Sequence, residues 1–387
     1  MAQSDTTTAL AVAINANVPV LLWGPPGQGK TSVINQIAES YGLTLETVIA
    51  SIRDPSDFAG LPVIDPVTKT VTLAHPKWAA NLQAAESEKP GSAVQFFDEI
   101  STAPGAVQAA LLRPILDKTV GDCFMGFGVR TVAAANPADI AAGGYDLAPP
   151  ISNRFVHLDW ELTAQQVREG FTTGWPTVDI PTTDPEAVAG RVNYIKGIVG
   201  AFLATRSDLL TVMPKDSSDA NKGFPTPRSW ENAAMLHAYA LEAGVNETVI
   251  ALLIKGVVGE SAGIEYISYY DNLDLPDPEA ILADPTKYVA PREREDKVYA
   301  VAGAVYNAAM QPHPNRKGRL TQALSFFGHL ASTHSDISYV YARTMMQWAR
   351  AEKQKGNGQG DPDAGFEIPS DILKKFADLF SRMGIDK

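Results

Sequence analysis

The first 160 residues alternate short apolar runs with longer amphipathic stretches. The apolar runs are rich in β-branched and aromatic residues and predict strands at 18–23, 45–50, 93–97, 131–135 and 156–160. Between them, apolar positions three and four residues apart predict helices at 31–41, 77–87 and 105–116. This alternation is typical of an α/β domain built on a parallel sheet.

Two further segments are predicted to be β-hairpins inserted between the sheet elements. In the first, residues 61–64 and 70–73 flank a turn. In the second, residues 119–121 and 127–130 flank a turn at 122–126 that carries Phe124 and Met125 near its tip. These two side chains are candidates for contact with a substrate, and packing against a neighbouring hairpin is an equally good alternative.

Beyond residue 160 the strand pattern ends and helical periodicity takes over. Helices are predicted at 164–171, 185–205, 229–243, 247–270, 296–310, 321–332 and 338–353. A proline-rich joint at 274–278 separates the first four of these helices from the last three. Residues 355–362, after the last of them, have the composition of a flexible linker. The last predicted helix, 371–383, has one apolar face, which is expected to pack on its own domain or on a partner.

The bulk composition limits the class of protein. With 387 residues, of which 45% are hydrophobic and 20% charged, the chain is expected to be a soluble globular protein of two or three domains. No apolar run approaches the roughly 20 residues of a membrane span, and the start of the chain lacks a secretion signal. Cys123 is the single cysteine, so we expect no intrachain disulfide and a cytoplasmic location.

The charge is acidic overall and uneven along the chain. A net charge of −12 argues against a protein that wraps nucleic acid. Residues 287–355 hold eleven basic and five acidic residues, a local excess of +6. Solvated helix faces explain this excess most simply, and a docking face for an acidic partner is the alternative.

One motif carries most of the functional signal. Residues 24–31 fit G-x-x-x-x-G-K-[ST], the phosphate-binding loop, between a predicted strand and a predicted helix. Backbone N–H groups of such a loop surround phosphate oxygens, its lysine reaches the β- and γ-phosphates, and its Thr ligates Mg²⁺. The predicted nucleotide-binding residues are Gly24, Pro25, Pro26, Gly27, Gln28, Gly29, Lys30, Thr31 and Ser32.

Polar residues at two later strand ends complete a catalytic set. Asp98 and Glu99 end an apolar strand; Asp98 is predicted to hold Mg²⁺ with Thr31, and Glu99 to orient and deprotonate the attacking water. Asn136 ends the next strand and is predicted to bond the γ-phosphate or that water. No zinc-ligand spacing competes with this chemistry, and His157, in an apolar strand, is expected to be structural.

Two arginines are further candidates for contact with phosphate. Arg154 lies just before the last predicted strand and suits an arginine finger supplied to the nucleotide of a neighbouring subunit. Arg228 lies near a helix start, where a cation does not favour the helix dipole, so a role at phosphate is predicted. Packing of Arg228 on Trp230 is the alternative.

The ordered set resembles the AAA+ ATPases, in particular the MoxR-like, dynein-related branch. Residues 24–31 are similar to the Walker A motif of that family and 94–99 to Walker B, while Asn136, Arg154 and Arg228 match sensor 1, the arginine finger and sensor 2. Residues 54–61 are similar to the start of the helix-2 insert of that branch, and 119–130 to its pre-sensor-1 hairpin. The chain departs from the family in carrying Asn153 where relatives often have Asp, and in running about a hundred residues past the usual lid.

The resemblance implies a domain plan and a function. The plan is an AAA+ α/β core (1–160), a helical lid (161–272), a helical extension (273–354), a linker (355–369) and a final helix (370–387). The implied function is ATP hydrolysis with Mg²⁺ in a homo-oligomeric, usually hexameric ring that remodels a protein partner, often beside a von Willebrand factor A domain. Two alternatives stay open: a DNA-stimulated motor or loader, and a scaffold that ATP locks without turnover.

Overall fold

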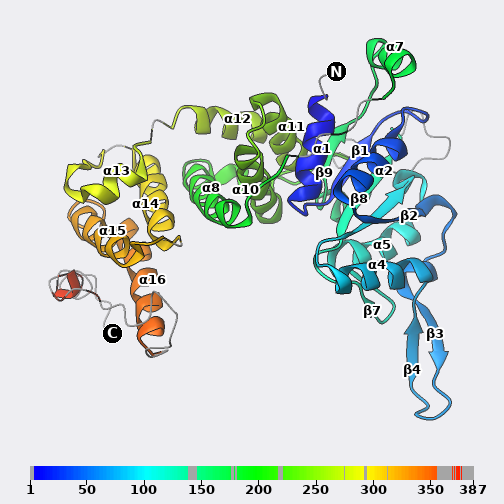
Figure 1. Cartoon of the computed structure of the whole chain (residues 1–387), viewed down its shortest axis with the longest axis horizontal. Helices are drawn as coiled ribbons and strands as arrows, with labels where there is room; N and C mark the ends of the chain where they lie inside the picture. Colours follow the sequence, from blue (N-terminus) through cyan, green and yellow to red (C-terminus); the bar gives the residue numbers. More distant parts are fainter. Residues whose placement is uncertain are drawn as a thin grey trace. The chain divides into compact units, whose positions relative to one another are not determined.

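The chain folds into two compact units (Figure 1). The computed structural model describes residues 4–137, 146–175, 178, 181–216, 221–273, 275–291, 294–311, 313–354, 368, 370, 372–374 and 376. The first unit is Met1–Pro185 with Asp208–Ile267, and the second is Glu186–Ser207 with Ser268–Lys387. The predicted linker and most of the predicted final helix lie outside the described residues.

A five-stranded parallel sheet forms the centre of the first unit, as predicted. Its strand order is β2-β5-β8-β1-β9. The strands are β1 (Val20–Trp23), β2 (Thr44–Ile49), β5 (Ala93–Asp98), β8 (Arg130–Ala135) and β9 (Val156–Asp159). The predicted helices around this sheet are confirmed as α2 (Lys30–Tyr41), α4 (Lys77–Glu88) and α5 (Gly105–Leu116). The fold class is therefore the predicted α/β core, followed by a helical region.

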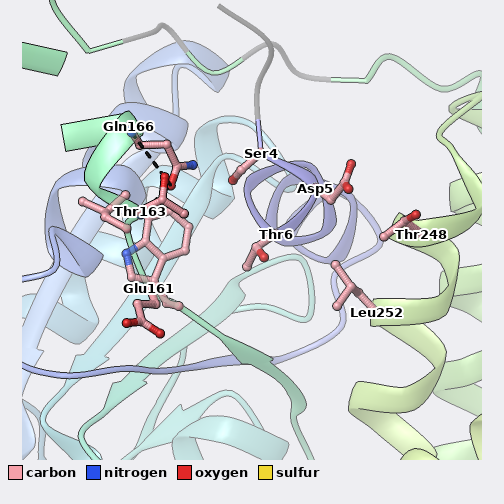
Figure 2. Close-up of a pocket in the computed structure, with 10 residues that line it drawn as sticks. Ser4, Asp5, Thr6, Glu161, Thr163, Gln166, Thr248 and Leu252 are labelled. Carbon is pink, nitrogen blue, oxygen red and sulfur yellow. Dashed lines mark hydrogen bonds between the residues drawn. The ribbon is translucent and has the colours of Figure 1, made fainter. Parts of the chain in front are cut away.

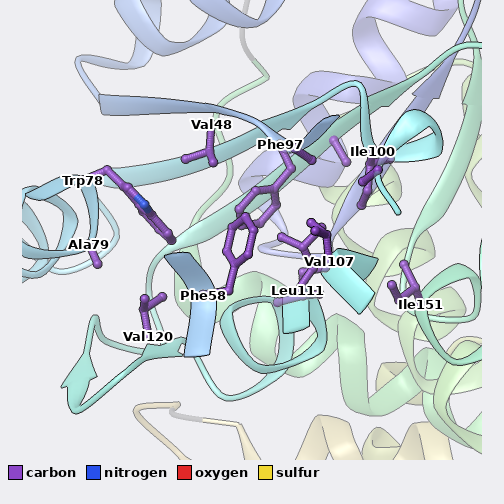
Figure 3. Packing of buried hydrophobic residues seen from close by; sticks show 14 of the residues in the cluster. Val48, Phe58, Trp78, Ala79, Phe97, Ile100, Val107, Leu111, Val120 and Ile151 are labelled. Carbon is purple, nitrogen blue, oxygen red and sulfur yellow. The ribbon is translucent and has the colours of Figure 1, made fainter. Parts of the chain in front are cut away.

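Aromatic side chains fill one side of this sheet (Figure 3). Phe58, Trp78 and Phe97 are buried and contact one another, with ring centroids 6.1 to 6.3 Å apart. Phe58 comes from the short helix α3 (Ser56–Ala59), Trp78 from α4 and Phe97 from β5. The packing fixes the segment after β2 against the strand that carries the acidic residues.

The first helix of the chain is absent from the sequence-based prediction. α1 (Asp5–Asn15) begins at Ser4, whose side chain accepts from the Thr7 N–H. Every residue from Ala9 to Ile14 is buried, because α11 and α10 cover one side of the helix and the sheet the other. A helix buried around most of its circumference shows little amphipathic period, which is why the pattern missed it.

The first predicted hairpin is confirmed and the second is shifted. β3 (Leu61–Ile64) pairs with β4 (Val71–Ala74). The second pairs β6 (Thr119–Val120) with β7 (Cys123–Phe124), so the prediction of a turn at 122–126 was wrong. Gly121 has a φ of +55°, a left-handed conformation that lets the chain reverse earlier than predicted.

This shift overturns one of the two predicted substrate contacts. Met125 follows β7 and is only 1% exposed, because it belongs to the hydrophobic core beneath the sheet. Phe124 is 44% exposed and makes an edge contact with Phe127, with centroids 4.9 Å apart. Only Phe124 therefore remains a candidate for contact with a substrate.

Helices complete the first unit. They include α6 (Pro149–Ser152), α7 (Ala164–Thr173), α10 (Pro227–Glu242) and α11 (Glu247–Val258). The single helix predicted at 247–270 is divided into α11 and α12 (Glu260–Asp271), because Gly259 adopts a φ of +86°. α10 and α11 pack on each other and on α1, and α11 also contacts β9.

The described residues of the second unit form helices joined by loops, with no strand among them. It contains most of α8 (Pro185–Thr205), together with α13 (Pro278–Ala283), α14 (Glu295–Met310), α15 (Arg316–Leu330) and α16 (Ser335–Gln354). Its core includes Phe326, Phe327, Ile372 and Phe376, so described residues of the predicted final helix pack on this unit. Among the described helices of the chain, none has the length and apolar character to cross a membrane.

Lys118, just before β6, gives the first unit a testable pH dependence. Its buried Nζ donates to the Thr131 hydroxyl at 2.5 Å, and burial lowers the pKa of Lys118 to about 7 from the usual 10.5. Between these values the unfolded chain holds a proton that the folded chain releases, so stability rises with pH. Relative to Lys118→Met, the wild-type protein is expected to gain roughly 2 kcal/mol between pH 7 and pH 9 in urea unfolding. A difference that stays flat over this range would contradict the buried, neutral amine.

Candidate functional site

The predicted phosphate loop connects β1 to α2. Gly27 and Gly29 have φ values of +79° and +75°, so both adopt left-handed conformations that other residues rarely take. Gly29 is the N-cap of α2 and supplies no side-chain cap, which leaves the first N–H groups of the helix for another acceptor. Gly24 has no space for a side chain, because a Cβ there would lie 2.1 Å from the Trp160 carbonyl oxygen. The loop is thus shaped to surround an anion with backbone donors.

Lys30 lies beneath this loop with its ammonium group surrounded by acceptors. Nζ donates to the carbonyl oxygens of Gly24 (2.5 Å) and Pro25 (3.0 Å) and to Asn136 Oδ1 (3.0 Å). Burial lowers the pKa of Lys30, and the nearby carboxylates of Asp98 and Glu99 oppose this shift. The structure therefore brings the predicted lysine and the predicted Asn136 into direct contact.

The two predicted metal ligands also meet. Thr31 Oγ1 donates to Asp98 Oδ2 at 3.0 Å, and Asp98 Oδ1 accepts from the Glu99 N–H at 2.9 Å. No group of three or more His, Cys, Asp or Glu side chains suited to a metal occurs in the part of the chain that the structure describes. One hydroxyl and one carboxylate fit Mg²⁺, which usually takes few protein ligands and completes its octahedron with phosphate oxygens and water.

Glu99 has an unusual backbone and a partner that sequence analysis missed. Its φ is +56°, a left-handed conformation that is uncommon for a residue with a side chain. Ser51 Oγ donates to Glu99 Oε2 at 2.5 Å. Ser51 lies in a short 3-10 helix directly after β2, and β2 neighbours β5 in the sheet. Its position at a strand end was visible in the sequence, but the adjacency of the two strands was not.

The main chain of Asn136 is held in place by two hydrogen bonds to Ser101. Its N–H donates to Ser101 Oγ at 3.2 Å, and the same hydroxyl donates to the Asn136 carbonyl at 3.0 Å. Ser101 lies in the 3-10 helix that follows Glu99. The reciprocal bonds tie the end of β8 to the end of β5, so Asn136 and Glu99 are positioned by one local structure.

The two predicted arginines lie near each other in the first unit. Arg154 is partly buried in the turn after α6, where it donates to the Pro150 carbonyl oxygen. Burial lowers the pKa of Arg154, the charge of Arg228 lowers it further, and Asp117 opposes both. Asn153 joins the two segments, donating to the Phe224 carbonyl at 2.9 Å and accepting from the Thr226 hydroxyl at 2.8 Å.

A cavity of about 340 Å³ lies between the start of α1, the segment after β9 and α11 (Figure 2), and two of its lining residues bond Gln28 of the phosphate loop. Trp160 Nε1 donates to the Gln28 carbonyl oxygen at 2.8 Å, and the Leu162 N–H donates to Gln28 Oε1 at 3.1 Å. The size suits part of a small ligand. Its mixed polar and apolar lining comprises Ser4, Asp5, Thr6, Trp160, Glu161, Leu162, Thr163, Gln166, Thr248 and Leu252.

Two polar residues of the core segment are used for structure. Gln108 is buried; its Nε2 donates to the Ala103 carbonyl at 3.1 Å and its Oε1 accepts from the Ala148 N–H at 3.2 Å. Arg130 donates to the carbonyl oxygens of Ile14 and Gly91. The Gln108 bonds connect α5 to the segment before α6, and the Arg130 bonds connect β8 to α1 and to the turn before β5.

Comparison with known proteins agrees with the site. Residues 20–140 match the family model AAA, described as "ATPase family associated with various cellular activities". No curated protein matches the chain. Among solved structures, a crystal structure of a "putative ATPase" from Cytophaga hutchinsonii is 16% identical over 65% of this chain and 80% of its own, with a TM-score of 0.34, which is too low to establish a shared fold. The matched family segment runs from β1 past Asn136, so it contains the phosphate loop and the acidic strand end.

The Ser51–Glu99 bond gives a prediction about turnover. The bond restrains the Glu99 side chain toward Ser51. Ser51→Ala is therefore expected to raise kcat for ATP about three- to tenfold with unchanged ATP affinity, measured by steady-state phosphate release and by nucleotide titration. Ser87→Ala, on the exposed side of α4, is the control. A lower kcat would mean that Ser51 orients Glu99 for the reaction instead of restraining it.

Proposed function

We propose that this protein hydrolyses ATP with Mg²⁺ and does so as a homo-oligomer. The observation that carries the proposal is the pair of contacts Lys30–Asn136 and Thr31–Asp98, which joins three separate segments around one phosphate loop. The match of residues 20–140 to the AAA family supports the same chemistry. The cavity beside Gln28 suits the adenine base, since it is adjacent to the loop and has both polar and apolar walls.

The residues divide the reaction among themselves. The loop N–H groups and Lys30 bind the β- and γ-phosphates, and Thr31 and Asp98 would hold Mg²⁺, which would supply neutralisation of the phosphate charge. Glu99 accepts a proton from water as the water oxygen bonds to the γ-phosphorus. The bond from that phosphorus to the bridging oxygen breaks, which gives ADP and inorganic phosphate. Asn136, which accepts a hydrogen bond from Lys30, holds the ammonium group in position for the γ-phosphate.

Arg154 and the phosphate loop of the same chain lie at opposite edges of the sheet, so Arg154 is too far away to contact its own nucleotide. In the parallel pair, Val20 is level with Val156 and Trp23 is level with Asp159, so the loop that starts at Gly24 is at the carboxyl edge. Arg154 precedes β9 and is at the amino edge, which lies about 10 Å or more away along the strands at roughly 3.3 Å per residue. We therefore assign Arg154, with Arg228 beside it, to the phosphates of a neighbouring subunit.

The oligomer is proposed to be a ring, most simply a hexamer of the MoxR-like type, that remodels a protein partner. The hairpin β3–β4 supports this role, because Leu61, Ile64, Val67 and Val71 are each 59 to 86% exposed. Exposed apolar side chains of this kind mark surfaces that bind proteins. A partner with a von Willebrand factor A domain is part of the proposal through the family resemblance alone. Stimulation of turnover by DNA would instead favour a motor or loader, which the net charge of −12 disfavours.

Two substitutions separate binding from turnover. Lys30→Ala removes the cation at the phosphates and is expected to weaken ATP binding at least tenfold. Glu99→Gln keeps the shape of the side chain but cannot accept the proton, so it is expected to bind ATP normally and lose at least a hundredfold in kcat. Nucleotide titration and phosphate release measure the two effects. Retained turnover in Glu99→Gln would remove this carboxylate from the reaction.

A mixing experiment tests the contribution of Arg154. Arg154→Ala is expected to bind ATP and hydrolyse it poorly, because its neighbours receive no arginine. Subunits carrying Glu99→Gln still offer Arg154, so mixing the two inactive variants is expected to restore part of the ATPase activity. The fraction restored should pass through a maximum as the ratio of the variants changes. No restoration at any ratio would contradict an arginine that acts between subunits.

A further inference from the structure

A bridge of side chains joins the strand that enters the phosphate loop to the turn that carries Arg154. Trp23 Nε1 donates to His157 Nδ1 at 2.9 Å, and His157 Nε2 donates to the Ser152 carbonyl oxygen at 2.9 Å. The two rings are nearly parallel, with 13° between their planes and centroids 6.3 Å apart. One imidazole ring thus uses both of its nitrogens to connect two separate parts of the first unit.

The bridge crosses the sheet from one edge to the other. Trp23 is the last residue of β1 and lies next to Gly24, at the carboxyl edge. Ser152 ends α6 before β9 begins, at the amino edge. Since β1 and β9 are parallel neighbours, the His157 side chain on β9 lies between these two points. The turn at 153–154, which carries Arg154, is called the arginine turn below. Two hydrogen bonds therefore connect it to the strand that enters the phosphate loop of the same chain.

The bridge requires a neutral imidazole and has one. Nδ1 accepts a hydrogen bond from Trp23 only when it carries no proton. Burial lowers the pKa of His157 to about 4, against a weaker opposing effect of the bond to Ser152. At neutral pH the ring is therefore uncharged, with its single proton on Nε2, where it donates to Ser152.

From Ser152 the connection continues to the second arginine. Ser152 Oγ donates to the Lys222 carbonyl at 3.2 Å, in the segment that leads into α10. The adjacent Asn153 bonds Phe224 and Thr226 of the same segment. Arg154 itself has a buried Nε without a hydrogen-bond partner among the described residues. Its guanidinium donates to the carbonyl oxygen of Pro150 in α6, the short helix that Ser152 ends, so its direction depends on the turn that the bridge holds.

We propose that His157 is a positioning residue for ATP hydrolysis, which sets the turn that presents Arg154 to the nucleotide of the next subunit. The proposal rests on the proposed function, because it requires Arg154 to act between subunits. It assigns His157 a role in what a subunit offers to its neighbour and none in the chemistry of its own phosphate loop. This separation allows a test that ordinary loss of stability does not imitate.

His157→Phe is the first variant, because it keeps a planar ring and removes both hydrogen bonds. ATP affinity is expected to stay within about twofold of wild type, since Lys30 and the loop are unchanged. The kcat of the pure variant is expected to fall about tenfold with little change in KM, because loss of both bonds leaves the turn that carries Arg154 without its connection to β1. Trp23→Phe, which removes only the N–H donor, is expected to show a smaller fall of the same kind.

Mixing distinguishes positioning of Arg154 from damage to the variant's own site. His157→Phe subunits keep Glu99, so neighbours that carry Glu99→Gln and a correctly placed Arg154 are expected to restore their activity. Neighbours that carry Arg154→Ala are expected to restore none, because neither subunit then offers a placed arginine. Restoration by the first partner and not by the second supports the proposal.

A control variant separates loss of the bridge from loss of any buried imidazole. His237→Phe removes another buried imidazole of the first unit, one that bonds the Tyr266 hydroxyl at 2.9 Å, and is expected to lower the melting temperature while retaining kcat. An equal fall in kcat in His237→Phe would overturn the proposal, as would failure of Glu99→Gln to restore His157→Phe while it restores Arg154→Ala. If Arg154→Ala is not restored either, the arrangement between subunits is wrong and both proposals fall. Should His157→Phe not fold, Trp23→Phe carries the same mixing test.

Discussion

The order of the strands is the constraint on which the site depends. β8 lies between β5 and β1, and all three run parallel, so their carboxyl ends meet at one edge of the sheet. Asp98 is the last residue of β5, Asn136 follows β8 and the phosphate loop follows β1. Their side chains meet within about one hydrogen-bond length, as the contacts of Lys30 with Asn136 and of Thr31 with Asp98 show. An order that placed further strands between β5 and β1 would separate the lysine from Asp98, because each added strand takes about 4.8 Å.

The buried positive charge of Lys30 at this edge is partly compensated by the two carboxylates beside it. Burial disfavours the charged form of Lys30, and Asp98 and Glu99 restore part of that loss. Glu99 in turn is held by Ser51, and Asn136 by Ser101, both from short helical turns directly after sheet strands. These serines connect the ends of neighbouring strands, so Glu99 and Asn136 are held by residues outside the phosphate loop.

Sequence reasoning located the strands and the polar residues at their ends, where the signal is local. The loop at 24–31 follows β1, the acidic pair stands at the end of β5 and Asn136 follows β8, and the structure brings Lys30 to Asn136 and Thr31 to Asp98; their catalytic roles stay predictions. Sequence reasoning failed where the deciding factor was contact between distant segments. α1 lacks an amphipathic period because both sheet and helices cover it, Met125 is buried because Gly121 reverses the chain early, and Ser51 became visible only once β2 and β5 were known to be neighbours.

His157 illustrates the same limit at the level of function. An imidazole in an apolar strand is expected to be structural, and its hydrogen bonds are indeed those of a satisfied buried residue. The two bonds are of interest because of where they lead: one reaches Trp23, next to the phosphate loop, and the other reaches Ser152, next to the arginine turn. A parallel sheet necessarily places the end of one strand and the start of the next at opposite edges. In the proposed function nucleotide binds at one edge and Arg154 acts from the other, and β9, paired with β1 and carrying His157, is the strand that connects the two edges.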